Sequence, residues 1–99
     1  MVETVVFGDF EWDQEKAHAN LAKHGVSFAE AASVFLDLDF ILTDDPTETG
    51  RFIALGFSSQ ARMLFVVHVE RGARVRIVSA RRATHAEART YERRKETPG

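Results

Sequence analysis

Two neighbouring segments of the sequence, residues 63–70 and 74–80, alternate between two sets of side chains and are separated only by Arg71-Gly72-Ala73. Alternation with a period of two is typical of a β-strand that buries one face. A connection this short joins antiparallel neighbours, because a parallel crossover needs about a dozen residues or more. We therefore expect a β-hairpin here, and the fold must be built around a sheet that contains it.

The register of this hairpin decides which side chains share a face, since a slip of one residue exchanges the two faces. A three-residue loop predicts that Glu70 pairs with Arg74. His68 then lies opposite Arg76, and one face gathers these four ionisable groups. The other face is entirely apolar and is expected to form the core, with Phe65, Val67, Val69, Val75 and Ile77.

Two helices are expected in a tight hairpin near the N-terminus. The first spans residues 14–24, with Asp13 as its N-cap and Gly25 as its C-terminal stop. The second, within residues 27–35, starts with a Ser-Phe-Ala-Glu capping box and carries apolar residues at helical spacing.

The remaining signals are one further helix and several strands. A second capping box, from Thr84 to Glu87, predicts a helix from His85 to about Lys95. Besides the hairpin, the expected strands are residues 10–12, 40–43 and 51–58. The sequence thus predicts an α+β fold, in which the helical hairpin packs on a four-stranded, or slightly larger, antiparallel sheet and a helix follows at the C-terminus.

Composition limits what this fold can be. Ninety-nine residues with 44% hydrophobic content suit one domain with one core, so we expect residues 1–99 to form a single domain. The absence of cysteine excludes disulfides and thiolate metal sites, and the four histidines lack zinc-binding spacing, so no metal or cofactor is expected. Without an apolar run or a signal-peptide pattern, we expect a cytoplasmic protein that does not enter a membrane.

The charges are segregated along the chain. Residues 1–50 hold eleven acidic residues and two lysines, a net charge of −9, whereas residues 51–99 hold eleven basic and four acidic residues, a net charge of +7. Ten of the eleven basic residues are arginines, whose planar guanidinium binds phosphate with two hydrogen bonds. The second half therefore predicts a surface for a polyanion, and the alternative is a merely solvated charged surface.

The ionisable face of the predicted hairpin has the groups that cleave RNA without a metal. Glu70 or a histidine would remove the 2′-hydroxyl proton, and Arg76 and Arg81 would hold the phosphate. From spacing alone, a cross-strand ion pair between Glu70 and Arg74 with no catalytic role is about as probable.

The first predicted helix offers a flanking polar stripe, because Lys16, Asn20 and Lys23 or His24 recur at helical spacing. Such a stripe could border a phosphate groove, although taken alone it is more often a solvated helix face. Arg82 precedes the N-terminus of the last helix, where backbone N–H groups also attract anions.

These residues together resemble the BrnT toxin family. The first part of the resemblance lies in Phe10-Glu11-Trp12-Asp13, Lys16-Ala17, Asn20 and Lys23-His24-Gly25-Val26-Ser27-Phe28. The second part lies in Glu70-Arg71-Gly72, Arg74-Val75-Arg76-Ile77-Val78-Ser79-Ala80-Arg81-Arg82-Ala83, Glu87 and Tyr91. The motifs follow one another in order over residues 10 to about 92.

The resemblance implies a RelE-like fold and an endoribonuclease whose RNA cleavage arrests growth. It implies neutralisation by a BrnA-type antitoxin with a ribbon-helix-helix domain, through which the pair would bind operator DNA. It also implies functional roles for Lys23, His24, Glu70, Arg76, Arg81 and Tyr91.

Combining the two arguments, we expect the catalytic residues to be Glu70, Arg76, Arg81 and His24. The expected RNA-binding residues are Lys16, Lys23, Arg74, Arg82 and Tyr91. The main alternative is a non-catalytic module that binds nucleic acid or protein with its arginine-rich face, and a relative that has lost its activity is a further one.

Overall fold

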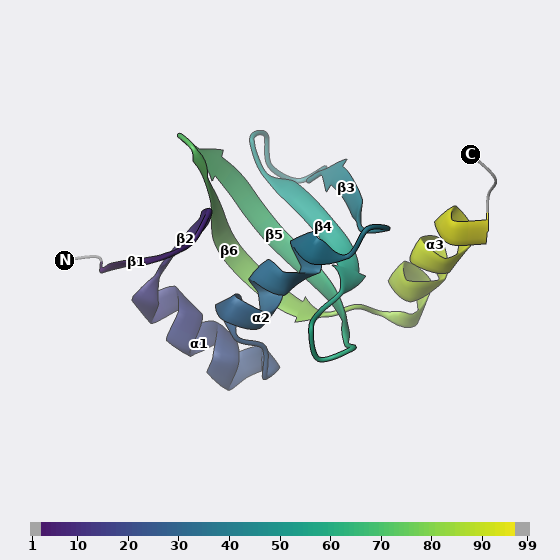
Figure 1. The fold of residues 1–99 in the computed structure, drawn as a ribbon, viewed down its shortest axis with the longest axis horizontal. Helices are drawn as coiled ribbons and strands as arrows, with labels where there is room; N and C mark the ends of the chain where they lie inside the picture. The colour runs from purple at the N-terminus through teal and green to yellow at the C-terminus, as the bar shows by residue number, and fades with distance from the viewer. Residues whose placement is uncertain (1–2, 97–99) are drawn as a thin grey trace.

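Six strands, three α-helices and one 3-10 turn make up the part of the chain that the structure, a computed structural model, describes, residues 3–96 (Figure 1). The strands join in one mixed sheet, which confirms the α+β class. In chain order the elements are β1 (Thr4–Phe7), β2 (Phe10–Asp13), α1 (Gln14–His24), α2 (Phe28–Ser33), the 3-10 turn η1 (Val34–Leu36), β3 (Ile41–Asp44), β4 (Phe52–Phe57), β5 (Met63–Arg71), β6 (Arg74–Arg82) and α3 (His85–Glu96). No helix within residues 3–96 is long and apolar enough to cross a membrane.

The helix ends follow local signals in the sequence. The Asp13 side chain accepts hydrogen bonds from two backbone N–H groups in the first turn of α1 and so caps this helix. Gly25 ends α1 in the left-handed region, with a φ of 69°, which glycine adopts without steric cost. Ser27 caps α2 through the N–H of Glu30. These expected boundaries are confirmed.

The last helix begins with the reciprocal capping that the sequence predicts. The Thr84 N–H donates to the Glu87 carboxylate at 2.9 Å, and the Glu87 N–H donates to the Thr84 hydroxyl at 3.2 Å. The second helix is shorter than expected, because α2 ends at Ser33 and η1 continues the chain over Val34–Leu36.

The sheet is larger than the predicted meander and is not purely antiparallel. Strands β3 to β6 pair antiparallel in chain order, as expected. The N-terminal segment, for which one strand is predicted, instead forms a hairpin of β1 and β2 that turns at Gly8. Strand β2 then lies parallel to β6, which gives the order β1-β2-β6-β5-β4-β3. The antiparallel expectation is wrong for this pair because no short connection between β2 and β6 fixes their directions.

The hairpin of β5 and β6 has a shorter loop than the sequence predicts. Arg71 pairs with Arg74, so the turn contains two residues, and Gly72 supplies the positive φ of 61° that such a turn requires. Glu70 consequently lies opposite Val75, and the expected pair of Glu70 with Arg74 does not form.

The observed register places a histidine in the core of the protein. His68 lies opposite Ile77, not Arg76, and is only 3% exposed. The strands then slip by one residue at Val67, where a β-bulge inserts Val78 into β6 as an extra residue.

The faces of β5 are therefore exchanged relative to the expected ones, whereas those of β6 up to the bulge are as expected, with Ile77 in the core and Arg76 on the opposite face. The fully buried residues on the side covered by α1 and α2 are Leu64, Val66, His68, Ile77 and Ala80. Phe65, Val67 and Val69, which are expected in the core, lie on the other face and are only partly buried. Strand β5 is apolar on both faces, so its alternation alone does not identify the inner one.

Helices cover the two faces of the sheet unequally (Figure 1). The main core lies under α1 and α2 and includes Trp12 and Phe28. A smaller cluster forms on the opposite face, where Tyr91 of α3 joins Ile41 and Leu55. The rest of that face, which no helix within residues 3–96 covers, is called the open face below.

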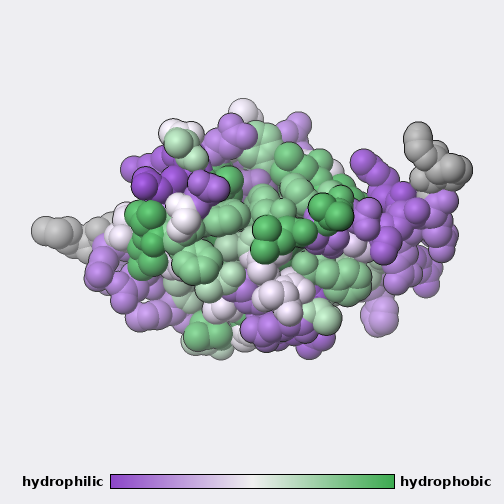
Figure 2. Space-filling model, viewed as in Figure 1, coloured by the Kyte–Doolittle hydropathy of each residue, from purple (hydrophilic) through white to green (hydrophobic). Residues whose placement is uncertain are grey.

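The side of the molecule that carries α1 and α2 has apolar patches across its middle, between hydrophilic ends (Figure 2). Leu36 and Leu38 are 82% and 99% exposed, and Phe7 is 51% exposed. Apolar side chains gathered on one side of a small protein are typical of a surface that contacts another protein.

Asn20 fastens α1 to the edge of the sheet. Its side-chain amide donates to the Ala80 carbonyl at 2.8 Å, and its carbonyl accepts from the Ala80 N–H at 3.1 Å. The same amide also donates to the Val26 carbonyl at 2.9 Å. Asn20 is 7% exposed, so it is not part of a solvated stripe, and it satisfies backbone groups of β6 that the neighbouring strand β2 does not reach.

We expect the Asn20→Ala substitution to lower the free energy of unfolding by about 2 to 4 kcal/mol, because it leaves several buried backbone groups without partners. Urea denaturation measures this change. The control is Lys23→Ala on the exposed surface of the same helix, which should change stability by less than about 0.5 kcal/mol. Equal losses in the two variants would contradict the role assigned to Asn20.

Candidate functional site

Arg76 lies on the open face and is paired with a carboxylate from β2. The parallel register places Glu11 beside Arg76, and Nη1 of Arg76 donates to the Glu11 carboxylate at 2.5 Å. Nε of Arg71 lies 3.8 Å from the same carboxylate. The side chains of Glu11 and Arg76 are 9% and 16% exposed. This pair is therefore much less screened by water than an ordinary surface ion pair.

Arg81 lies at the border of the open face, beside α3, and is held at two points. Its guanidinium donates two hydrogen bonds to Glu87 of α3, at 2.8 and 2.9 Å, and its Cζ lies 3.9 Å from the ring centroid of Phe65. The hydrogen bonds with Glu87 raise the pKa of Arg81 and are the main cause that lowers the pKa of Glu87. A guanidinium that is both paired and stacked has a fixed orientation.

A groove of about 230 Å³ runs between α1 and the edge of β6. Its lining consists of Lys16, Ala19, Asn20, Lys23, His24, Val78 and Ser79. Lys16 and Lys23 are exposed and His24 is partly buried. The predicted polar stripe of α1 thus faces β6, with Asn20 at its base and the basic side chains around it.

Ser79 connects this groove to the open face. It lines the groove and also pairs with Val67, on the face that carries Arg76 and Arg81. The basic side chains on this face of β6 and along the groove are together named the basic band; they are Arg74, Arg76 and Arg81 of β6 and Lys16, Lys23 and His24 of α1.

Three other expected functional residues lie outside the basic band. Glu70 is exposed near the end of β5 and shares its face with Val75, not with the arginines. Tyr91 is 1% exposed and donates to Asp37 at 2.7 Å, and burial is the main cause that raises its pKa. Arg82 is exposed at the end of β6.

His68, which the expected register would present at the surface, belongs to the core. Its ring packs edge to face on Phe35, with centroids 5.0 Å apart, and lies 6.0 Å from the ring of Phe52. Burial is the main cause that lowers the pKa of His68, so the neutral ring is favoured. Its Nδ1 has no hydrogen-bond partner in the described part of the chain. The expectation of an outward-facing imidazole is therefore wrong.

A second buried carboxylate, that of Glu30, which the sequence predicts only as part of a capping box, instead ties the helical hairpin to the sheet. Glu30 accepts from the Ser58 hydroxyl at 2.7 Å and from Nε of Arg62 at 2.9 Å. Arg62 also donates to the Gly25 carbonyl at 3.0 Å, and its hydrogen bond is the main cause that lowers the pKa of Glu30. The partners are about 30 residues apart in sequence, so no local motif predicts this network.

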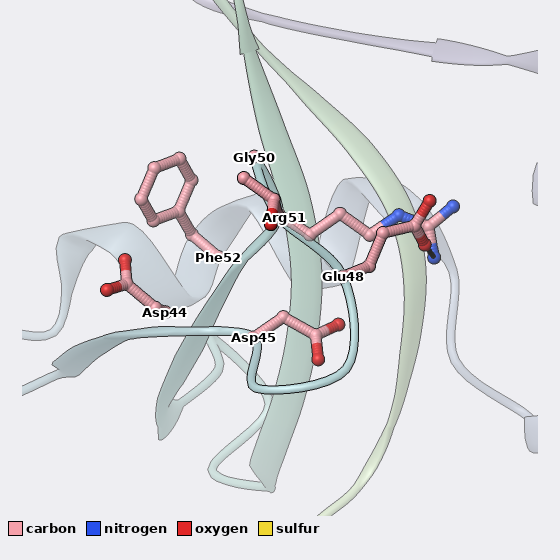
Figure 3. A pocket seen from close by; sticks show the side chains of 7 residues that line it. Asp44, Asp45, Glu48, Gly50, Arg51 and Phe52 are labelled. Carbon is pink, nitrogen blue, oxygen red and sulfur yellow. Dashed lines mark ion pairs between the residues drawn. The ribbon is translucent and has the colours of Figure 1, made fainter.

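A hollow of about 330 Å³ lies at the turn between β3 and β4 (Figure 3). Its charged lining is mainly acidic, with Asp44, Asp45 and Glu48. Arg51, which extends beside Glu48 in Figure 3, is paired with it at 3.0 Å. A lining of this charge repels phosphate, so the basic band is the better candidate for a polyanion site. Among residues 3–96, no group of three or more His, Asp or Glu side chains could hold a metal ion.

The basic band combines the two kinds of group that phosphodiester chemistry requires. Arg76 and Arg81 are cations of fixed orientation that can stabilise charge on a phosphate. His24 carries an imidazole, the side chain best suited to move a proton near neutral pH.

We expect Glu87→Gln to lower stability at neutral pH by a few tenths to about 1 kcal/mol, since it removes the charge of a partly exposed pair. The folded state lowers the pKa of Glu87 from its usual 4.5, so this contribution is present above that value and is lost as the pH falls through the lowered pKa. Urea midpoints of the wild type and the variant should therefore converge on acidification. Glu92→Gln, an exposed position on the same helix, is the control, and a difference that persists in acid would contradict the assignment.

One solved structure with a similar fold is the 1.1 Å crystal structure of the Brucella abortus ribonuclease toxin, BrnT. The two chains have a TM-score of 0.61 and 27% sequence identity, and the match covers 75% of this chain and 94% of that chain. A search of curated proteins gives no match.

The sequence model described as "Ribonuclease toxin, BrnT, of type II toxin-antitoxin system" matches residues 12–87. This stretch contains both helices of the hairpin, strands β3 to β6 and the Glu87 that binds Arg81. The chain therefore belongs to the BrnT family of type II toxin-antitoxin ribonuclease toxins.

Proposed function

We propose that this protein is an endoribonuclease toxin that cleaves RNA along the basic band without a metal ion. It acts in the cytoplasm as one RelE-like domain of residues 1–99. A BrnA-type antitoxin with a ribbon-helix-helix domain neutralises it, and the complex reaches operator DNA only through that antitoxin. Family membership supports the class of activity, and the geometry of the basic band supports the place.

The observation that carries this proposal is the meeting of two surfaces at Ser79. The open face contributes two arginines that carboxylates hold in place, and the groove contributes His24 with two exposed lysines. An RNA backbone that crosses the edge of β6 would contact both surfaces at once. This arrangement favours a single-stranded path, because neighbouring phosphates must turn over a sheet edge.

In this proposal the arginines take the part that a metal ion plays in other nucleases. Arg76 and Arg81, five residues apart on β6, bind the RNA backbone on either side of the cleaved bond and stabilise the charge that develops on the scissile phosphate. His24 takes the proton from the 2′-hydroxyl, whose oxygen attacks the phosphorus, and water supplies the proton to the 5′ oxygen that leaves. Glu70 is a weaker candidate for the base, because RNA would have to pass around the end of the β5–β6 hairpin to reach it.

The remaining expected contacts are electrostatic. Lys16, Lys23 and Arg74 are exposed and extend the basic band along the backbone of a bound RNA. Arg82 would contact a bound RNA strand that continues toward α3. Tyr91 supports the site indirectly, because its buried ring anchors α3, the helix that carries the Glu87 partner of Arg81.

We expect the purified protein to cleave single-stranded RNA in excess EDTA and its induced expression to arrest growth. Coexpression with a BrnA-type antitoxin should restore growth. The control is a variant that combines Lys16→Glu with Lys23→Glu. Both positions are exposed, so this variant should fold but should no longer bind RNA. RNA that is bound but left intact would identify a binding module instead, and cleavage that stops in EDTA would contradict metal independence.

We expect His24→Gln to lower the rate of RNA cleavage by about 100-fold or more, because it removes a proton-transfer group. RNA affinity, measured by fluorescence anisotropy, should change much less. His18→Gln is the matched control, since His18 lies on the same helix but lines a different hollow beside Leu21. An unchanged rate in His24→Gln would exclude His24 as the proton-transfer group.

A further inference from the structure

Glu11 is the one acidic residue of β2 whose side chain lies beneath the arginines of the open face. Its register partner is Arg76, which belongs to a strand 65 residues later in the chain. The sequence places Glu11 next to Trp12 in a short alternating segment and gives no sign of this partner. Only the parallel pairing of β2 with β6 brings the two together.

The surroundings of Glu11 distinguish it from a surface carboxylate. Its side chain is 9% exposed and contacts two guanidiniums, Arg76 at 2.5 Å and Arg71 at 3.8 Å. A buried carboxylate is tolerated because cations compensate it, and the cluster keeps a net charge of +1. An apolar pair of similar shape would stabilise the sheet at least as well, so stability alone is a weak reason for an ion pair here.

Glu11 restricts the orientation of the Arg76 side chain. A free arginine side chain samples many rotamers, and ordering it on binding a phosphate is costly. Nη1 of Arg76 donates a hydrogen bond to Glu11, and the 84% burial of the Arg76 side chain restricts the remaining rotations of that side chain. Arg81 is held similarly by Glu87, at 2.8 Å, but from α3. The two guanidiniums of the open face are thus fixed by carboxylates from different elements.

We propose that Glu11 is a positioning residue of the ribonuclease, which orients Arg76 toward the phosphate in the transition state. The inference rests on the proposed function, because it assigns Arg76 to the phosphate. Glu11 itself does not touch RNA. Its negative charge opposes RNA binding slightly, and its benefit lies in a pre-ordered guanidinium.

This role predicts opposite effects on binding and on turnover when the charge is removed. In Glu11→Gln the repulsion of RNA decreases, so affinity should rise by a few fold. The looser Arg76 should lower kcat by about tenfold or more. A purely structural defect would instead reduce the active fraction, which lowers kcat without tightening RNA binding.

The first experiment measures kcat and RNA affinity of Glu11→Gln and of a matched control, Glu48→Gln. Glu48 pairs with Arg51 at 3.0 Å on the turn between β3 and β4 (Figure 3) and does not belong to the basic band. The control should leave both quantities unchanged. A Glu11→Gln variant with wild-type kcat, or with losses of affinity and rate together, would overturn the inference.

The second experiment does not depend on catalysis. Nuclear magnetic resonance of the arginine Nε–H groups should show an ordered Arg76 in the wild type and a mobile one in Glu11→Gln, with Arg76→Lys identifying the signal. An Arg76 that stays ordered in Glu11→Gln would refute the positioning role. If the wild type fails to cleave RNA but Arg76 loosens as expected, the proposed function fails while the structural part of the inference stands.

Discussion

Most of this structure depends on how soon the pairing of β2 with β6 ends. Strand β2 pairs with β6 at only two positions before the chain turns into α1, so the rest of that edge of β6 needs another partner. The Asn20 side chain supplies it at Ala80 and at the same time binds the Val26 carbonyl between the helices. Together with the Glu30 network, this amide holds the helical hairpin against the sheet, where His24 and Ser79 line one groove. The groove of the basic band is a direct result.

Features that depend on local chemistry could be predicted from the sequence. The caps at Asp13, Ser27 and Thr84 and the stop at Gly25 give the helix ends, because each needs only side chains within one turn. The register of β5 and β6 could not be predicted, for two reasons. Both faces of β5 are apolar, so burial does not select one face, and the bulge at Val78 shifts the pairing partway along the strand.

The candidate site likewise contains residues that the sequence predicts and residues whose place depends on the strand register. Arginine at positions 76 and 81 and the polar stripe on α1 follow from charge segregation and helical spacing, and the structure brings them together around Ser79. The expected companions, Glu70 and His68, depend on the register and lie elsewhere. The actual partner of Arg76 is Glu11, which only the three-dimensional pairing of distant segments reveals.

The two ion pairs of the open face differ in the sequence separation of their partners. Glu87 and Arg81 are six residues apart, whereas Glu11 and Arg76 are 65 apart. Closing the longer loop carries the larger entropic penalty. The side chains of Glu11 and Arg76 are nevertheless 9% and 16% exposed, against 24% and 34% for Glu87 and Arg81, and the more exposed pair opens more readily in local fluctuations. A transient detachment of the first turn of α3 would release Arg81 while Arg76 stays in place. The two ends of the same phosphate-binding surface would then have different lifetimes in the native ensemble.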